Sequence, residues 1–306
     1  QNEYARADKA AGWMLLAKIY LNAEVYIGED HYSDCLNYCE QIINSGYQLN
    51  PNYLNDFMAD NDQGLSRQEV IFPIVSDGIV TQNYGPTTVM INGQIGSLEQ
   101  NGEQFGVNAG GWNGAIRVTQ QFSETFLEGP YLEDARNTLI MADRTINIPD
   151  ISKRDTGFIT AKWSNRTSTG ESGSALEIVD TDFPMFRLAD VYLMYAEAHL
   201  RGGGGTLSSA VGYVNALRAR ANNPERISTS GLTLDLILNE RTVELYWEAH
   251  RRQDLIRFNK FTGGSYNWSW KGSTANGIAI DDTRKLFPIP SASLAANPNL
   301  TQNPGY

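Results

Sequence analysis

The sequence has no apolar run long enough to cross a bilayer, and it has fewer basic than acidic residues. Its 306 residues include 24 Lys and Arg against 35 Asp and Glu, which gives a formal net charge of −11. No Lys or Arg occurs between Arg67 and Arg117. A membrane-spanning helix needs about 20 apolar residues, and nucleic acids and anionic lipids attract basic surfaces. We therefore expect no transmembrane helix, and neither nucleic acid nor an anionic bilayer as the partner.

Cysteine and histidine are scarce, which limits the chemistry open to the chain. There are two cysteines, Cys35 and Cys39, and three histidines. A zinc site needs further Cys or His ligands at suitable spacing, so two small buried thiols are the favoured interpretation and a metal site is the alternative. No Gly-x-Ser-x-Gly or His-Glu-x-x-His motif occurs. We predict no metal, no cofactor and no catalytic residues.

The amino-terminal end shows no secretory leader, and the first residue is Gln1 instead of Met. A leader would have a basic start followed by an apolar stretch and a cleavage site of small residues. The chain is therefore interpreted either as a processed protein or as a fragment of a longer one, and the sequence leaves both possibilities open.

Apolar residues recur at helical spacing over much of the chain. Residues 4–26 and 31–44 form an expected helix pair, and the same order recurs at 188–200 and 208–222. In both places a Gly-containing turn and a following Pro end the helices. A helix pair of about 34 residues with this punctuation is typical of tetratricopeptide repeats. The predicted fold class is mainly α, with tetratricopeptide-like helical repeats, long irregular loops and a few short β-strands.

The composition changes along the chain and predicts three regions. Residues 1–69 hold the first helix pair. Residues 70–180 combine short apolar runs with many Gly and Asn residues, and long loops of this kind usually carry function. Residues 181–306 hold a helical repeat at 187–224, a long helix expected at 233–258 and a loop-rich tail.

Two of the expected helices carry charged residues among apolar ones. The helix that begins at Leu188 has apolar residues on two faces, so we expect it to lie between other helices. Charges buried in such a place must be paired, and Arg suits bidentate pairing with carboxylates. We predict a structural ion-pair network between the two helices that includes Arg187, Asp190, Glu197, Glu244, Arg252 and Asp254.

The alternative for these acidic residues is an acid/base pair of the kind that glycosidases use. Such a pair needs two carboxylates about 5–10 Å apart that face an open cleft. The neighbouring arginines would keep both carboxylates ionised and would not raise the pKa of either one. The structural interpretation is therefore favoured.

Three segments together resemble the carboxy-terminal portion of SusD/RagB-family proteins. They are Asp182-Phe-Pro-Met-Phe-Arg-Leu-Ala-Asp-Val-Tyr-Leu-Met-Tyr-Ala-Glu-Ala198, the charged stretch from Asn239 to Phe258, and the tail Leu286-Phe-Pro-Ile-Pro290 with Asn299–Tyr306. Weaker matches occur at 6–23 and 142–163. Because the segments occur in order over nearly the whole chain, the set is more specific than any one of them.

The resemblance implies a SusD-like α-α superhelix and an outer-membrane nutrient-binding lipoprotein at the cell surface of a Bacteroidetes-like bacterium. It implies no catalytic residues, a glycan ligand and a SusC-like TonB-dependent transporter as the partner. Family members are usually longer, and their amino-terminal portion begins at a lipidated cysteine. We therefore expect the membrane anchor to lie in that portion. A helical stack cut at this point should also leave an apolar face of its first helix uncovered.

A glycan surface needs exposed aromatic rings for the apolar faces of sugars, and amide or carboxylate groups for the hydroxyls. The first candidate set lies between residues 70 and 118 and consists of Trp112, Asn113, Tyr84, Asn83 and Asn92. The second set consists of Tyr266, Trp268 and Trp270. The alternative for each tryptophan is packing in the core, which is favoured for Trp13, Trp163 and Trp247.

The leading prediction is non-catalytic binding of oligo- or polysaccharides for delivery to the transporter. The RagB branch of the family suggests peptides as the alternative ligand, and a peptide groove should show spaced apolar pockets or an exposed strand edge. A structural docking module without its own ligand is a further alternative, and it should show no exposed aromatic cluster. A glycoside hydrolase is the least favoured possibility.

Overall fold

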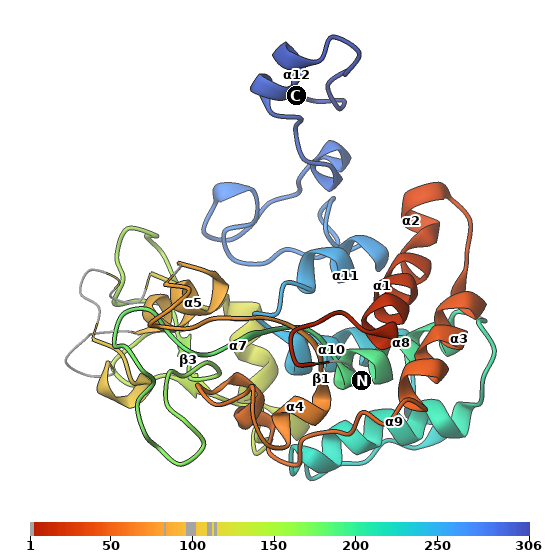
Figure 1. Ribbon diagram of the computed structural model, residues 1–306. Coiled ribbons are helices and arrows are strands. Elements are labelled where there is room, and N and C mark those ends of the chain that lie inside the picture. The colour runs from red at the N-terminus through yellow and green to blue at the C-terminus, as the bar shows by residue number, and fades with distance from the viewer. Residues whose placement is uncertain (1–2, 83, 96–101, 109–111, 113–114) are drawn as a thin grey trace. The chain divides into compact units, whose positions relative to one another are not determined.

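The computed structural model describes residues 3–82, 84–95, 102–108, 112 and 115–306 (Figure 1). Contacts divide the chain into a first unit, Gln1–His250, and a second unit, Arg251–Tyr306. The described part is mainly helical, with two short two-stranded antiparallel sheets. The mainly α fold class is thereby confirmed, whereas the three sequence regions 1–69, 70–180 and 181–306 stay a prediction.

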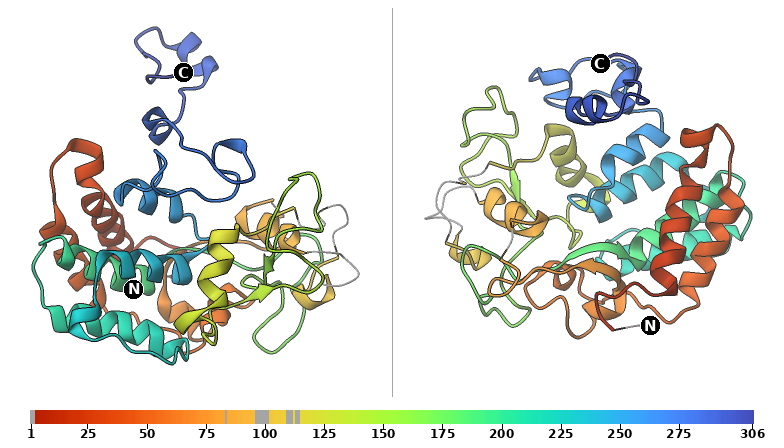
Figure 2. Two further views of the ribbon diagram at one scale, coloured as in Figure 1. Left: turned by 180° about the vertical axis from the view of Figure 1, so that it is seen from behind. Right: turned by 45° about the horizontal axis from the view of Figure 1, so that its top comes forward.

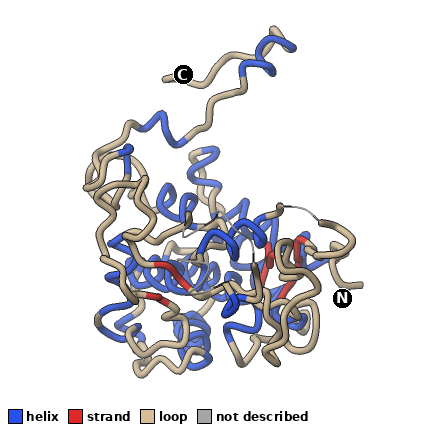
Figure 3. Tube along the Cα trace, turned by 90° about the vertical axis from the view of Figure 1, so that its left-hand side faces the viewer, coloured by secondary structure: helices blue, strands red, loops and turns tan. Residues whose placement is uncertain are grey.

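The elements of the first unit are the helices α1 (Lys9–Leu21), α2 (Ala23–Ile27), α3 (Tyr32–Ile43), α4 (Ser66–Glu69), α5 (Pro86–Gln94), α7 (Gln120–Leu127), α8 (Leu188–Leu200), α9 (Leu207–Arg220) and α10 (Leu234–Leu245), and the strands β1 (Val70–Ile74), β2 (Leu139–Ile140), β3 (Ile159–Thr160) and β4 (Phe183–Arg187). The second unit contains α11 (Arg251–Arg257) and α12 (Ser291–Ala296). Loops make up much of the remaining chain (Figure 3).

Helix α8 is the centre of the helical stack. It packs against α3, α9 and α10 and also contacts α1, which itself packs against α3 (Figure 2). Both apolar faces of α8 are used, because Leu188, Val191, Leu193 and Ala196 all have no exposed surface. The expected position of this helix between other helices is therefore confirmed. Cys35 and Cys39 of α3 lie in the same core as free, buried thiols.

The first expected helix, 4–26, is divided in the structure. Helix α1 begins after Asp8, whose carboxylate accepts a hydrogen bond from the Ala11 N–H. It ends before Asn22, and the Asn22 side chain donates to the Lys18 carbonyl. Helix α2 follows directly. Leu15 and Ile19 on the outer side of α1 are exposed, which is the uncovered apolar face that the sequence predicts.

The prediction of one long helix at 233–258 is wrong. Helix α10 ends at Leu245, and Trp247 and Ala249 have positive φ angles of 58° and 65°. No Gly or Pro marks this break in the sequence. The carbonyls freed at the helix end are satisfied from elsewhere in the fold, because Arg187 donates to the Glu244 carbonyl and Lys162 donates to the Tyr246 carbonyl.

Strands β1 and β4 bring distant segments together at the base of α8. Val70 pairs with Arg187 and Ile74 pairs with Phe183, so Glu69 lies beside Arg187. A second core packs next to this sheet, on the side of the loop-rich region. Its buried members include Phe57, Trp163 and Ile91 of α5. This core fixes α5 on the loop-rich side of the first unit.

A buried ion-pair network connects these elements around Glu244 of α10. Its carboxylate accepts hydrogen bonds from Arg136, Arg187 and Arg220, at 3.1 Å for Arg136 Nη1 and 2.6 Å for Arg187 Nη1. Arg187 Nε also pairs with Glu248 at 2.6 Å. Burial by itself raises the pKa of Glu244, but the three guanidinium groups outweigh it and lower that pKa. The prediction that Arg187 and Glu244 belong to one internal network is confirmed.

Asp190 forms a second buried cluster in the helical stack. Lys18 Nζ lies 2.8 Å from Asp190 Oδ2, and Arg241 Nη1 lies 2.8 Å from Oδ1. His250 Nδ1 lies 3.1 Å from Lys18 Nζ. Because an ammonium only donates, this imidazole nitrogen accepts and His250 is neutral. Burial lowers the pKa of His250 to about 4, and Lys18 acts in the same direction.

Three predicted members of the network have other partners. Glu197 pairs with Arg201 on the same helix at 2.9 Å. Asp254 pairs with Arg257 at 2.8 Å within the second unit. Arg252 donates to the Lys285 carbonyl at 2.8 Å and lies over the Phe287 ring at 4.3 Å, also within the second unit. Glu197 thus pairs within α8, and Asp254 and Arg252 have partners within the second unit, in addition to the Arg187–Glu244 pair that the sequence predicts.

No helix in the described residues is long and apolar enough to cross a membrane.

Replacement of Asp190 by Ala should lower the free energy of unfolding by about 3–5 kcal/mol, because Lys18 and Arg241 both lose their ion pair with this buried carboxylate. Urea denaturation measures this difference. The exposed Asp30→Ala variant is the control and should stay within about 0.5 kcal/mol of the parent. If Asp190→Ala lowered the free energy of unfolding by only a few tenths of a kcal/mol, this result would contradict the burial of the cluster.

His250 should make stability depend on pH. The folded protein keeps His250 neutral down to about pH 4, whereas the unfolded chain binds a proton below about pH 6.5. The stabilising contribution is therefore complete above pH 6.5 and is lost as the pH falls to 4. Between pH 6.5 and pH 4, the free energy of unfolding of His250→Gln should fall by about 3 kcal/mol less than that of the parent chain. Parallel slopes for the two proteins would refute this.

Candidate functional site

Among the predicted ligand residues of the first unit that the structure describes, Tyr84 is the most exposed. It lies just before α5, where Gly85 and Pro86 start the helix, and 60% of its side chain is exposed. Its hydroxyl donates to Glu177 Oε1 at 2.5 Å, and this hydrogen bond raises the pKa of Tyr84. The bond holds the phenol by its edge and leaves the ring in solvent. An exposed ring with a fixed orientation is suited to stacking.

The loop before Tyr84 is held by acidic side chains from the segment 174–182. Asp182 Oδ1 accepts from the Ser76 N–H at 2.7 Å, and Asp180 Oδ1 accepts from the Gly78 N–H at 2.8 Å. Gly78 permits close contact, because an added Cβ would lie 2.8 Å from the Ala175 Cβ. The two segments therefore form one surface with Tyr84 at its edge.

Asn92 lies inside this surface and not on it. It has no exposed area, and its Nδ2 donates to the Thr88 and Glu177 carbonyls, each at 2.9 Å. Its position on α5 turns it toward the core that contains Ile91. We therefore correct its role from ligand contact to support for the Glu177 main chain.

Trp112 is partly exposed and lies near the other end of α5. The Ile116 N–H donates to the Gly93 carbonyl at 2.8 Å, and the Ala115 N–H donates to the Trp112 carbonyl at 3.0 Å. Arg154 Nη1 also donates to the Trp112 carbonyl, at 3.1 Å. The fold thus brings a basic side chain next to a stretch that has none in the sequence. The predicted residues Asn83 and Asn113 lie outside the described residues.

The second candidate set lies in the second unit, where its rings pack on one another. Trp268 stacks on Phe261 with centroids 5.9 Å apart and an interplanar angle of 26°, and Tyr266 lies 5.9 Å from Trp268. Lys271 Nζ lies 4.8 Å from the centre of the Trp268 ring. The faces of Trp268 are largely occupied by these contacts. Trp270 is partly exposed and has a φ of 69°.

The carboxylates of the buried network give no support to a glycosidase mechanism. A general acid needs a raised pKa and an open cleft. Burial raises the pKa of Glu248, but Arg187 and Lys162 outweigh it and lower that pKa. Asp182 has a pKa raised to about 6 by burial, yet its oxygens accept from Ser76 N and Tyr4 Oη, and the group is almost fully buried.

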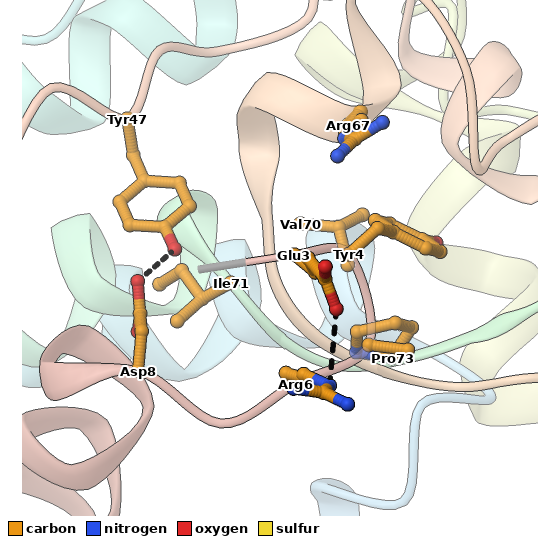
Figure 4. A pocket seen from close by; sticks show the side chains of 10 residues that line it. Glu3, Tyr4, Arg6, Asp8, Tyr47, Arg67, Val70, Ile71 and Pro73 are labelled. Carbon is orange, nitrogen blue, oxygen red and sulfur yellow. Dashed lines mark hydrogen bonds and ion pairs between the residues drawn. The ribbon is translucent and has the colours of Figure 1, made fainter. Parts of the chain in front are cut away.

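A small pocket in the first unit lies beside β1 and contains none of the predicted ligand residues (Figure 4). The Tyr47 hydroxyl donates to Asp8 Oδ2 at 3.1 Å, and Arg67 lies 5.4 Å from the centre of the Tyr4 ring. Tyr47, Asp8 and Tyr4 thus already have partners within the protein, since the Tyr4 hydroxyl donates to Asp182. Among the residues that the structure describes, no group of three or more His, Cys, Asp or Glu is arranged to hold a metal ion.

Two residues that contact the predicted ligand residues Tyr84 and Trp112 were not selected from the sequence. Glu177 lies 93 positions from Tyr84, and Arg154 lies 42 positions from Trp112. Neither belongs to a motif. Only the absence of Lys and Arg from residues 167–186, as from 68–116, could have indicated that the two stretches share an environment.

Comparison with protein families gives a match to the SusD family over residues 44–306. The starch-binding protein SusD of Bacteroides thetaiotaomicron is 34% identical, with 100% of this chain and 62% of that protein aligned. A SusD-like protein of Bacteroides ovatus is 26% identical, with 94% of this chain and 53% of that protein aligned. The chain thus spans between about half and three-fifths of the length of these relatives.

Solved structures show the same fold. Surface glycan-binding protein A from Bacteroides thetaiotaomicron superposes with a TM-score of 0.70 at 24% identity, over 99% of this chain and 65% of that chain. The same protein in complex with laminarihexaose gives a TM-score of 0.70 at 24% identity, over 99% of this chain and 66% of that chain.

Replacement of Trp268 by Ala should destabilise the second unit by about 2 kcal/mol, because a partly buried ring is lost from its stack. Faster limited proteolysis between residues 251 and 306 would report this change. Retardation by polysaccharides should stay unchanged. If the variant lost retardation without faster proteolysis, Trp268 would be a ligand contact and not a packing residue.

Proposed function

This chain belongs to the SusD family, and we propose that it is a non-catalytic protein that binds glycans at the outer-membrane surface and delivers them to a SusC-like TonB-dependent transporter. The observation that carries the proposal is the Tyr84 ring, which is exposed and fixed by Glu177. The relatives named as starch-binding and glycan-binding proteins support glycans as the ligand class.

Tyr84 and Trp112 are the two proposed stacking residues. Helix α5 separates them, and its nine residues span about 13 Å. This length suits several consecutive sugar rings in place of a single enclosed sugar. The Glu177 carboxylate is bonded to the Tyr84 hydroxyl. It can also accept hydrogen bonds from sugar hydroxyl groups, since a carboxylate has about four acceptor positions and Tyr84 uses one.

A peptide is the second candidate ligand, and one observation favours it. Ile79, Val80 and Leu176 are exposed on the same two segments as Tyr84, with Val80 82% exposed. Exposed aliphatic side chains suit apolar peptide residues better than sugar hydroxyls. Val80→Ser separates the two ligands, because it should weaken peptide binding and leave glycan binding unchanged.

Removal of either ring should weaken glycan binding. Loss of one stacked ring costs about 2 kcal/mol, which corresponds to about thirtyfold in the dissociation constant. Native gels that contain starch or laminarin measure this as lost retardation of Tyr84→Ala and Trp112→Ala. Tyr26→Ala is a matched control, because Tyr26 on α2 is 58% exposed but lies outside the surface. Unchanged retardation of both ring variants would show that the site is elsewhere.

A further inference from the structure

The two chain segments that form the surface around Tyr84 contain acidic residues and no Lys or Arg. This surface is built from residues 76–82, 84–94 and 174–182, and the sequence has no Lys or Arg in the enclosing stretches 68–116 and 167–186. Three carboxylates lie on it, those of Asp77, Glu177 and Asp180. Their charges are not offset by any basic side chain from either stretch.

Hydrogen bonds hold these carboxylates in place. Asp77 Oδ1 accepts from the N–H groups of Ile79 and Val80, at 2.7 Å and 2.5 Å, and these bonds lower the pKa of Asp77. Asp180 accepts from the Gly78 and Ser174 N–H groups. Donors of this kind stabilise the ionised form. The surface is therefore negatively charged at neutral pH.

Glu177 is the carboxylate closest to the proposed stacking ring. Its main chain is fixed on both sides, because Asn92 donates to its carbonyl at 2.9 Å and the Asn108 N–H donates to the Leu176 carbonyl at 2.8 Å. Its side chain is exposed apart from the bond with Tyr84. Any ligand that stacks on Tyr84 thus meets a fixed negative charge that accepts hydrogen bonds and donates none.

We infer that the Tyr84 surface selects uncharged glycans over glycans that bear carboxylate or sulfate groups, and that Glu177 is the residue that sets this preference. This inference rests on the proposed glycan binding at Tyr84. The hydroxyl groups of a neutral sugar donate to the Glu177 carboxylate, whereas an anionic substituent is repelled by it and finds no basic partner within the two segments.

Arg154 does not compensate for Glu177. It is bonded to the Trp112 carbonyl, near the opposite end of α5. The length of α5, about 13 Å, exceeds the screening length of about 8 Å at physiological ionic strength. Arg154 therefore affects groups near Trp112 and has little influence on an anion beside Tyr84.

The test compares a neutral polysaccharide with its own carboxylated derivative, so that the backbone of the ligand stays the same. Retardation is measured in native gels with starch or carboxymethyl starch, and with laminarin or carboxymethyl laminarin, for the parent chain and Glu177→Gln. Gln keeps an oxygen that accepts from Tyr84 but has no charge. Glu29→Gln removes the same charge at an exposed position beyond α2 and is the control.

The parent chain should bind the neutral polymer more tightly than its carboxymethyl form. This preference should fall about fivefold in Glu177→Gln, stay unchanged in Glu29→Gln and shrink in 0.5 M salt, roughly where screening removes surface charge effects. Equal binding of both polymers by the parent, or an unchanged preference in Glu177→Gln, overturns the inference. If neutral binding is lost in Tyr84→Ala while Glu177→Gln has no effect, glycan binding stands and only the selectivity fails. Absence of any retardation overturns both proposals.

Discussion

The contact between Glu244 and its three arginines is the constraint on which the rest of the first unit depends. Arg187 arrives from the end of β4, Arg220 from α9 and Arg136 from the loop before β2. Because the side chains of all three arginines are buried, a shift of any one element would break a buried ion pair with Glu244. Buried ion pairs add little net stability compared with apolar packing. We propose that the network here fixes which elements meet.

That constraint extends to the candidate surface through the strand pair. The pairing of β1 with β4 sets Glu69 next to Arg187, and it also brings residues 76–82 alongside residues 174–182. The core around Trp163 and Ile91 then fixes α5, which bonds to Glu177 and Val179 of the second segment. Tyr84 is therefore exposed on a loop whose two ends are both tied to buried structure. A ring held in this way loses little conformational freedom when a ligand stacks on it.

The chain uses charge differently inside and outside. Inside, acidic groups lie against basic side chains that lower their pKa values, chiefly Lys18 for Asp190 and three arginines for Glu244. On the surface near Tyr84, acidic groups bond to main-chain N–H groups and to one phenol, with no arginine from the same segments. The first arrangement holds the fold together. The second orders two loops and leaves a negative field where a ligand would bind.

Local patterns in the sequence determined the helical architecture, since burial of α8 on two faces, the pairing of α1 with α3 and the burial of Cys35 and Cys39 all follow from residues a few positions apart. The resemblance of its motifs to the SusD/RagB family also needed only the sequence. Tertiary structure decided three other features. Helix α10 ends after Leu245, where Lys162 and Arg187 donate to the freed carbonyls. Asn92 is buried, and Tyr84 pairs with Glu177. The physical reason is distance along the chain. Periodicity reports which face of a helix is apolar, but it holds no information on which side chain more than 40 positions away supplies a hydrogen bond.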